Sequence, residues 1–197
     1  MVNLTSLGEG VVALVAAFLA FSASEEARTS PGTSLVVLCR LIITAAAVLG
    51  TARYSNQPTF VSIHFFFRQL ANLLPVVVTA LSSLRLLGSH LAVSSILDFQ
   101  GDIMLGTVAA ALVCFFTKEE AHGKPIQVAA IALLAASVGS GFSNLGGTYE
   151  VLCLAAALTV FIARDVLLRA VFSSKVAEPM RRATLAVALL LLWSALG

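Results

Sequence analysis

The chain alternates between long apolar runs and short polar breaks. A helix that crosses a bilayer needs about 20 mostly apolar residues. Seven runs are candidates for such helices, and they cover residues 9–24, 34–52, 69–88, 97–117, 125–143, 149–172 and 183–197. Turn formers mark the breaks, as at Pro31-Gly32, Asn56-Gln57-Pro58 and Asn144-Leu145-Gly146-Gly147. The pattern therefore predicts an all-α fold, a polytopic membrane helical bundle of about seven transmembrane helices.

Composition supports the same class. The chain is 59% hydrophobic and 11% charged, whereas soluble domains carry about 25% charged residues. Its net charge of +2 is too small to suggest a nucleic-acid partner. We expect one transmembrane domain over residues 1–197, with a first repeat over about 1–145 and a partial second repeat over about 146–197.

No pattern of reactive side chains points to catalysis. The three cysteines, Cys39, Cys114 and Cys153, lie inside apolar runs and lack the spacing of a metal site or a disulfide framework. The sequence has no GxSxG, HExxH or phosphate-binding glycine loop. We therefore expect no enzyme activity, no cofactor and no metal.

The basic residues are distributed unevenly over the predicted loops. With seven spans, one side of the membrane receives Arg53, Arg68, Lys118, Lys124, Arg164, Arg169, Lys175, Arg181 and Arg182. The other side receives Arg28 and Arg85, and Arg40 falls within the second span. Because cytoplasmic loops are enriched in Lys and Arg, we place the N-terminus on the side of the cytosol, matrix or stroma, and the C-terminus on the opposite side. The membrane itself stays open between a mitochondrial or plastid inner membrane and the Golgi or ER.

A polar strip over residues 94–102 precedes the fourth span. Read as a helix, it places Ser94, Asp98 and Asp102 on one face. An ionisable group inside the bilayer costs a few kcal/mol, so these carboxylates would face protein or a water-filled cavity. Alternatively, they stand at the water-facing N-terminal end of the helix, where the macrodipole favours negative charge.

Arg40, in the middle of the second span, is the leading partner for an aspartate that turns inward. Its alternative roles are snorkelling towards the interface or an ion pair that ties two helices together. The candidate central polar site therefore consists of Ser94, Asp98, Gln100, Asp102 and Arg40.

Two other features concern packing. In the fifth span, Ser137, Gly139, Gly141 and Ser143 give a small-residue pattern suited to close contact between helices. His64 stands beside the aromatic run Phe65-Phe66-Phe67, which is typical of an aromatic belt at the headgroup level.

Residues 16–25 and 156–165 align without a gap, with Ala16, Ala17, Phe21 and Ala23 matching Ala156, Ala157, Phe161 and Ala163. This offset makes the sixth span the partner of the first and gives a repeat of five helices. A copy that follows an odd number of helices is inserted the other way up, which is how many secondary transporters are built.

With these segments, the chain resembles the drug/metabolite transporter superfamily, and within it the triose-phosphate and nucleotide-sugar translocators. Segment 94–103 is similar to the fourth helix of that family, and Phe115-Phe116-Thr117-Lys118-Glu119 to its short L-F-L-G-E loop. Segment 133–141 is similar to the family's fifth helix, and Arg164-Asp165-Val166-Leu167-Leu168-Arg169 to the R-N-V-x-x-K end of the sixth. The resemblance implies a bundle made of two inverted five-helix repeats.

The departures from the family bear on function. The lysine that meets phosphate in the family would fall at or beside Gln100, and the acidic neighbourhood there would repel an anion. The family's glutamate-proline pair becomes Asp102-Ile103, and helices eight to ten have no counterpart. One chain would then lack most of the second repeat, against which alternating access rocks the first.

Two functions remain open. The first is a non-catalytic integral membrane protein with a transporter-derived fold, an accessory structural subunit whose partners are lipids and other membrane subunits. The second is an active secondary transporter of a small anionic metabolite, completed by dimerisation. The sequence favours the first, which makes a small-molecule substrate doubtful.

Overall fold

A computed structural model describes residues 4–22, 31–54, 58–87, 96, 98–165, 184, 186–188 and 190–191 of the chain. The regular structure in these ranges is entirely helical, as the sequence predicts. The α-helices are α1 (Leu4–Ser22), α2 (Pro31–Tyr54), α3 (Val61–Leu87), α5 (Gln100–Thr117), α6 (Lys124–Leu145) and α7 (Tyr149–Asp165). Two short 3₁₀ helices, η2 (Pro58–Phe60) and η3 (Glu120–Gly123), join α2 to α3 and α5 to α6.

Four of these helices, α2, α3, α5 and α6, are long and apolar enough to cross a membrane. The apolar parts of α1 and α7 are shorter, Ser6–Ser22 and Tyr149–Ala163. Each of the first six predicted spans overlaps one helix, and the seventh, 183–197, lies mostly outside the described residues. The described part therefore contains four membrane-length helices where the sequence predicts seven spans in the whole chain, and the five-helix repeat stays a prediction.

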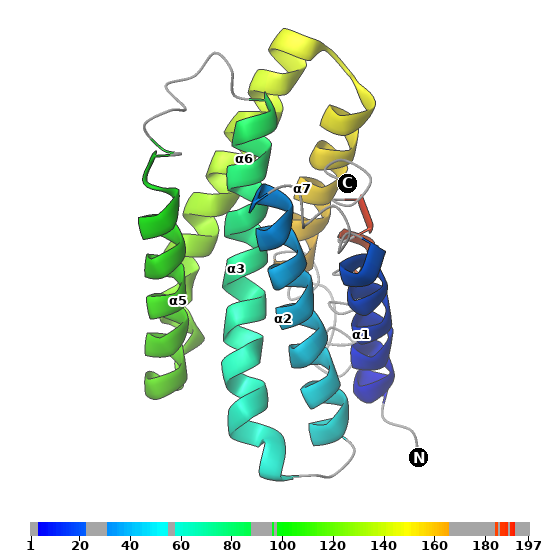
Figure 1. Ribbon diagram of the computed structural model, residues 1–197, viewed down its shortest axis with the longest axis vertical. Helices are drawn as coiled ribbons and strands as arrows, with labels where there is room; N and C mark the ends of the chain where they lie inside the picture. Colours follow the sequence, from blue (N-terminus) through cyan, green and yellow to red (C-terminus); the bar gives the residue numbers. More distant parts are fainter. Residues whose placement is uncertain are drawn as a thin grey trace.

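Helix α3 lies at the centre of the bundle. It packs against α2 on one side and against α5 and α6 on the other, while α1 packs on α2 and α7 on α6 (Figure 1). Its interior positions are apolar almost without a break from Leu73 to Ala80, apart from Pro75 and Thr79, so the helix can be covered on several faces. Helices α5 and α6 make few contacts with each other, although only the η3 turn separates them in the chain.

The turns form where the sequence has suitable residues. Helix α5 ends at Lys118, which takes the left-handed conformation with φ of 59°. Pro125 stands in the first turn of α6, where a missing N–H costs nothing. Gly146 follows α6 with φ of 69°, a conformation that favours glycine. These local signals explain why the end of α5 and both ends of α6 lie close to the predicted ones.

The largest core cluster joins α1, α2, α3, α6 and α7. Leu19, Ile43, Leu134, Leu154 and Phe161 are at most 2% exposed and supply its bulk. The outward face of α1 is apolar too, since Leu14, Phe18 and Phe21 are 74%, 63% and 81% exposed. Such a surface suits contact with lipid or with another membrane protein.

Candidate functional site

Of the predicted central polar site, the structure describes Asp98, Gln100, Asp102 and Arg40, and Arg40 lies on a different helix from the other three. Asp98 and Asp102 are exposed at the N-terminal end of α5, and the Gln100 side chain accepts a hydrogen bond of 3.1 Å from Nη2 of Arg85. This is the position that the alternative interpretation gives the aspartates, where the dipole of α5 favours negative charge. Ser94 lies outside the described residues.

Arg40 is buried, at 6% exposure, and faces α1. Its Nη1 donates a hydrogen bond of 2.8 Å to the carbonyl oxygen of Leu19. Leu19 belongs to the last turn of α1, where its carbonyl also accepts a hydrogen bond of 3.0 Å from the Ser22 hydroxyl and where the dipole favours a cation. The structure therefore uses Arg40 to tie α2 to the end of α1, and it does not bring Arg40 to Asp98 or Asp102.

The small residues of α6 divide between two faces. Ser137 and Gly141 are buried, whereas Gly139 and Ser143 are exposed. A Cβ added at Gly139 would have no heavy atom within 4 Å. Residues two apart on a helix point about 200° apart, so the single packing face expected from the sequence consists of Ser137 and Gly141 alone.

A polar cluster that the sequence analysis missed lies where α1, α2 and α3 meet, at the end of the bundle where α2 ends and α3 begins. Glu9 from α1 and His64 from α3 are each 1% exposed. Both press on Gly50 of α2, because a Cβ there would stand 3.0 Å from Glu9 Oε1 and 3.0 Å from His64 Nε2. Because glycine has no side chain, the Glu9 carboxylate and the His64 imidazole can both lie this close to the backbone of α2.

Arg53, one turn beyond Gly50, completes the cluster. Its Nη1 lies 3.1 Å from Nδ1 of His64, and its guanidinium lies 5.4 Å from the ring centroid of Tyr54. Since a guanidinium only donates hydrogen bonds, Nδ1 of His64 is the acceptor. The hydrogen of the neutral imidazole then sits on Nε2, on the side of Gly50 where the Glu9 carboxylate lies. A carboxylate, an imidazole and a guanidinium thus gather beside Gly50, and we call them the Glu9–His64–Arg53 cluster.

The sequence contains only weak signals for this cluster. Glu9 stands at the start of an apolar run, as Asp102 and Glu150 do, so its position does not distinguish it. His64 is a single histidine beside three phenylalanines. Phe65 and Phe66 contact Phe115 of α5 at ring-centroid distances of 6.5 and 5.5 Å, and the aromatic belt at the headgroup level stays a prediction. His64 itself points into the bundle, one position away from those rings.

Further polar contacts join one helix to the next. Arg68 of α3 forms an ion pair of 3.2 Å with Glu120 of η3. Gln127 of α6 donates a hydrogen bond of 3.1 Å to the carbonyl oxygen of Asn72 in α3. These contacts, like that of Arg40, hold adjacent helices together.

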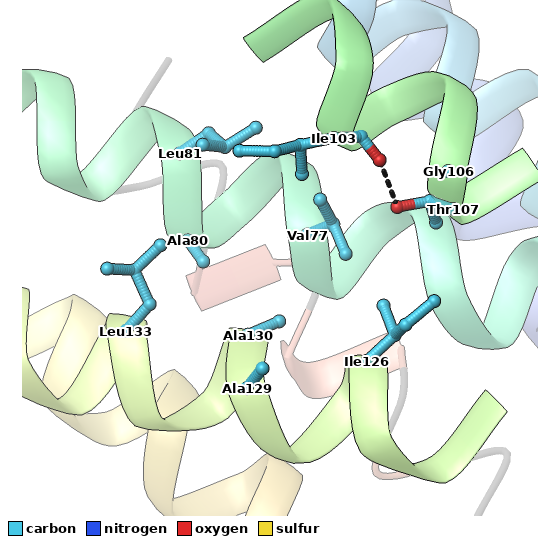
Figure 2. Close-up of a pocket in the computed structure, with 10 residues that line it drawn as sticks. All are labelled: Val77, Ala80, Leu81, Ile103, Gly106, Thr107, Ile126, Ala129, Ala130 and Leu133. Atoms are coloured by element: carbon cyan, nitrogen blue, oxygen red, sulfur yellow. Dashed lines mark hydrogen bonds between the residues drawn. The ribbon is translucent and has the colours of Figure 1, made fainter. Parts of the chain in front are cut away.

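A cavity of about 410 Å³ lies between α3, α5 and α6. Ten residues line it, and Figure 2 shows them with the hydrogen bond of Thr107: Val77, Ala80, Leu81, Ile103, Gly106, Thr107, Ile126, Ala129, Ala130 and Leu133. The single polar side chain among them is that of Thr107, and its hydroxyl donates 2.7 Å to the carbonyl oxygen of Ile103. We call this space the α3–α5–α6 cavity.

The arrangement can hold a proton or an apolar molecule, at two separate places. Glu9 and His64 are buried ionisable side chains that both lie against Gly50, which is typical of proton relays in membrane proteins, and the cavity suits an apolar guest. In the described ranges, no three His, Cys, Asp or Glu residues stand close enough to hold a metal ion.

Together, these features define the class: a helical bundle with membrane-length helices and an interior that is mostly apolar. The chain matches no family model, no curated protein and no solved structure. The likeness to the drug/metabolite transporters therefore stays a resemblance of motifs.

Proposed function

We propose that this protein is a non-catalytic integral membrane protein with a transporter-derived fold, and that it serves as an accessory structural subunit of a larger membrane complex. The observation that carries the proposal is that polar side chains form contacts from one helix to the next. Arg40, Arg68 and Gln127 each tie one helix to its neighbour. Such contacts stabilise a fixed arrangement of helices, which is what a structural subunit needs.

The α3–α5–α6 cavity supports the proposal, because it is a poor site for a small anionic metabolite. Phosphate and carboxylate groups need Lys, Arg or a helix N-terminus. None of the ten lining residues is charged, and the hydroxyl of Thr107 already bonds to the backbone. Partners would then be lipids and neighbouring membrane subunits, which the exposed apolar faces of α1 and α5 could contact.

A second candidate is the secondary transporter of a small anionic metabolite, completed by dimerisation. The Glu9–His64–Arg53 cluster is the observation that favours it. Buried ionisable residues inside membrane helices mark proton relays in pumps and transporters, and Glu9 and His64 are both nearly inaccessible.

The proposed orientation uses the ends of the helices. Arg53 stands at the end of α2, Lys118 follows α5 and Lys124 begins α6, so these residues lie at one end of the bundle, while Arg85 lies at the other. We place the first end, and with it the N-terminus, on the side of the cytosol, matrix or stroma. The membrane would be that of an organelle, a mitochondrial or plastid inner membrane or the Golgi or ER.

Native mass spectrometry of tagged full-length protein, released directly from its own membrane, tests the proposal. We expect the chain in a larger assembly with other subunits in constant ratio. Recovery of only a monomer or a dimer of this chain would contradict the proposal.

The same preparation can test the second candidate after reconstitution into proteoliposomes. Under that candidate, uptake of a phosphorylated metabolite would follow a proton gradient, and Glu9→Gln would abolish it. Under the accessory-subunit proposal, wild type and Glu9→Gln show equal uptake, no greater than that of empty liposomes.

A further inference from the structure

The α3–α5–α6 cavity has a floor, two walls and an opening. Val77, Ala80 and Leu81 of α3 form a buried floor. Gly106 of α5 and Ala129 of α6 also line the cavity, yet both are exposed. The opening therefore lies between α5 and α6, which face each other across the cavity in Figure 2 and make few contacts with each other.

When these helices cross a bilayer, the opening faces its hydrocarbon. All three helices around it have membrane length, and of the residues in the spans of α5 and α6 only 17% and 28% are buried. The outer face of α5 is apolar as well, with Leu105 70% and Phe116 76% exposed. A molecule that enters the cavity from the side must come from the lipid phase.

Water is a poor occupant of this space. A buried water needs two to four polar partners, and apolar cavities stay dry. The Thr107 hydroxyl is the one polar side-chain group in the lining, and it donates to Ile103. Empty apolar volume also loses the dispersion contacts that its walls would otherwise make, so a flexible hydrocarbon chain stabilises the cavity by filling it.

Charged groups stand at one end of the cavity. Arg85 lies one turn beyond Leu81 on α3, and Asp102 precedes Ile103 on α5, with Asp98 a further turn away. Arg85, Asp98 and Asp102 are exposed, and the Arg85–Gln100 hydrogen bond joins the two helix ends at this level. A cation beside two carboxylates, where the span of α3 ends and that of α5 begins, complements the phosphate and ammonium groups of a zwitterionic lipid.

We propose that the α3–α5–α6 cavity binds an acyl chain of a zwitterionic phospholipid, whose headgroup lies against Arg85, Asp98 and Asp102. The chain enters between α5 and α6, over Gly106 and Ala129. This site gives the polar strip a role in lipid contact. It requires insertion in a membrane but no partner subunit, so its failure and that of the accessory-subunit proposal are separate results.

Photolabelling tests this site with full-length protein in nanodiscs of phosphatidylcholine. A small fraction of the lipid carries a photoactivatable diazirine on one acyl chain, and mass spectrometry locates the adducts. We expect the adducts to concentrate on residues of the cavity lining in α3 and α6. Adducts spread evenly over the outer face of α5, or cross-links between two copies of this chain through the cavity, would overturn the proposal.

Two variants fill the cavity. Gly106→Leu fills it from α5, where an added Cβ meets nothing within 4 Å, and Ala129→Leu fills it from α6. A leucine side chain at either position occupies the space that the lipid chain would fill and removes its dispersion contacts with the lining, so labelling of the lining falls well below that of the wild type. Gly139→Leu is the matched control, since Gly139 has the same open surroundings outside the cavity, and it keeps wild-type labelling. Equal labelling of all four proteins contradicts the proposal.

The headgroup contact is tested by changing the headgroup of the lipid probe and by neutralising the two aspartates. Labelling by the phosphatidylcholine probe should exceed labelling by a phosphatidylglycerol probe or a free fatty-acid probe with the same diazirine. Asp98→Asn with Asp102→Asn should remove that preference, while the total labelling of the lining with phosphatidylcholine falls only slightly. If the fatty acid labels the lining as well as phosphatidylcholine does, or if the double variant keeps the preference, the headgroup contact is wrong.

Discussion

The two ends of α3 meet their neighbours in opposite ways. Near its N-terminus, His64 and the Glu9 carboxylate both press on Gly50, and no room is left for a side chain there. Further along, Val77, Ala80 and Leu81 face a cavity of about 410 Å³, and Gly106 across from them has open space. The polar contact at Gly50 leaves no free space, whereas the apolar side chains of α3 border a cavity. Within this bundle, therefore, polar groups position the helices closely, while apolar side chains leave a space that lipid can fill.

Removal of His64 is expected to have the largest effect. His64→Leu removes the imidazole that accepts a hydrogen bond from the Arg53 guanidinium, and loss of a hydrogen bond to a charged group costs about 1.5–3 kcal/mol. Unfolding of the purified protein in mixed micelles of increasing SDS content measures this loss. Ser62→Leu is the control, because Ser62 is exposed near His64 on the same helix, and its change stays within about 0.5 kcal/mol. Equal stability of the two variants would show that the cluster contributes nothing.

The sequence predicted where the helices lie along the chain, but not which side of each helix is buried. Apolar runs and turn residues such as Pro125 and Gly146 place the ends of α6 within two residues of the predicted ones. Helix α3, in contrast, begins eight residues before the predicted span, at Val61. The predicted span leaves out the aromatic segment Phe65-Phe66-Phe67, whereas the helix includes it, and Phe65 and Phe66 pack on Phe115 of α5.

The sequence could not show which individual side chains are buried, and the reason is physical. The spans of α3 and α5 are similarly apolar, yet 56% of the residues in the first are buried and 17% in the second. A helix that is apolar all round has no stripe that identifies its inner face. Glu9 is buried, and Arg40 is buried against Leu19, because of the helices that lie beside them. Which helices are neighbours depends on the whole fold and cannot be read from the residues near Glu9 or Arg40 in the chain.

A second comparison concerns the two faces of α6. Ser137 is 0% exposed, so Ser137→Leu overpacks the contact with its neighbours and lowers stability by about 1–3 kcal/mol. At exposed Gly139, by contrast, Gly139→Leu leaves stability unchanged or raises it by up to about 1 kcal/mol through helix propensity. The same SDS titration compares the two variants. A loss at Gly139 as large as that at Ser137 would place both residues on one packing face.

The smallest effects are expected at the polar strip. Asp98→Asn and Asp102→Asn alter exposed carboxylates and change the free energy of unfolding by no more than about 0.5 kcal/mol. Arg40→Met removes one of two donors to the Leu19 carbonyl, which keeps the Ser22 hydroxyl, and costs about 0.5–1.5 kcal/mol. A double-mutant cycle on Arg40 and Asp98 should give no coupling. Coupling above about 0.5 kcal/mol would restore the central polar site that the sequence suggests.

The central contrast is between the tightly packed polar contact at Gly50 and the cavity beside Gly106. The most direct test adds one methyl group at each glycine. At Gly50, the new Cβ would stand 2.8 Å from Cδ of Glu9, whereas at Gly106 it would meet nothing within 4 Å. We expect Gly50→Ala to lower the free energy of unfolding by about 1–3 kcal/mol and Gly106→Ala to raise it by up to about 1 kcal/mol, measured side by side in the same lipid mixture. Equal changes in the two variants, or a larger loss at Gly106, would contradict the contrast.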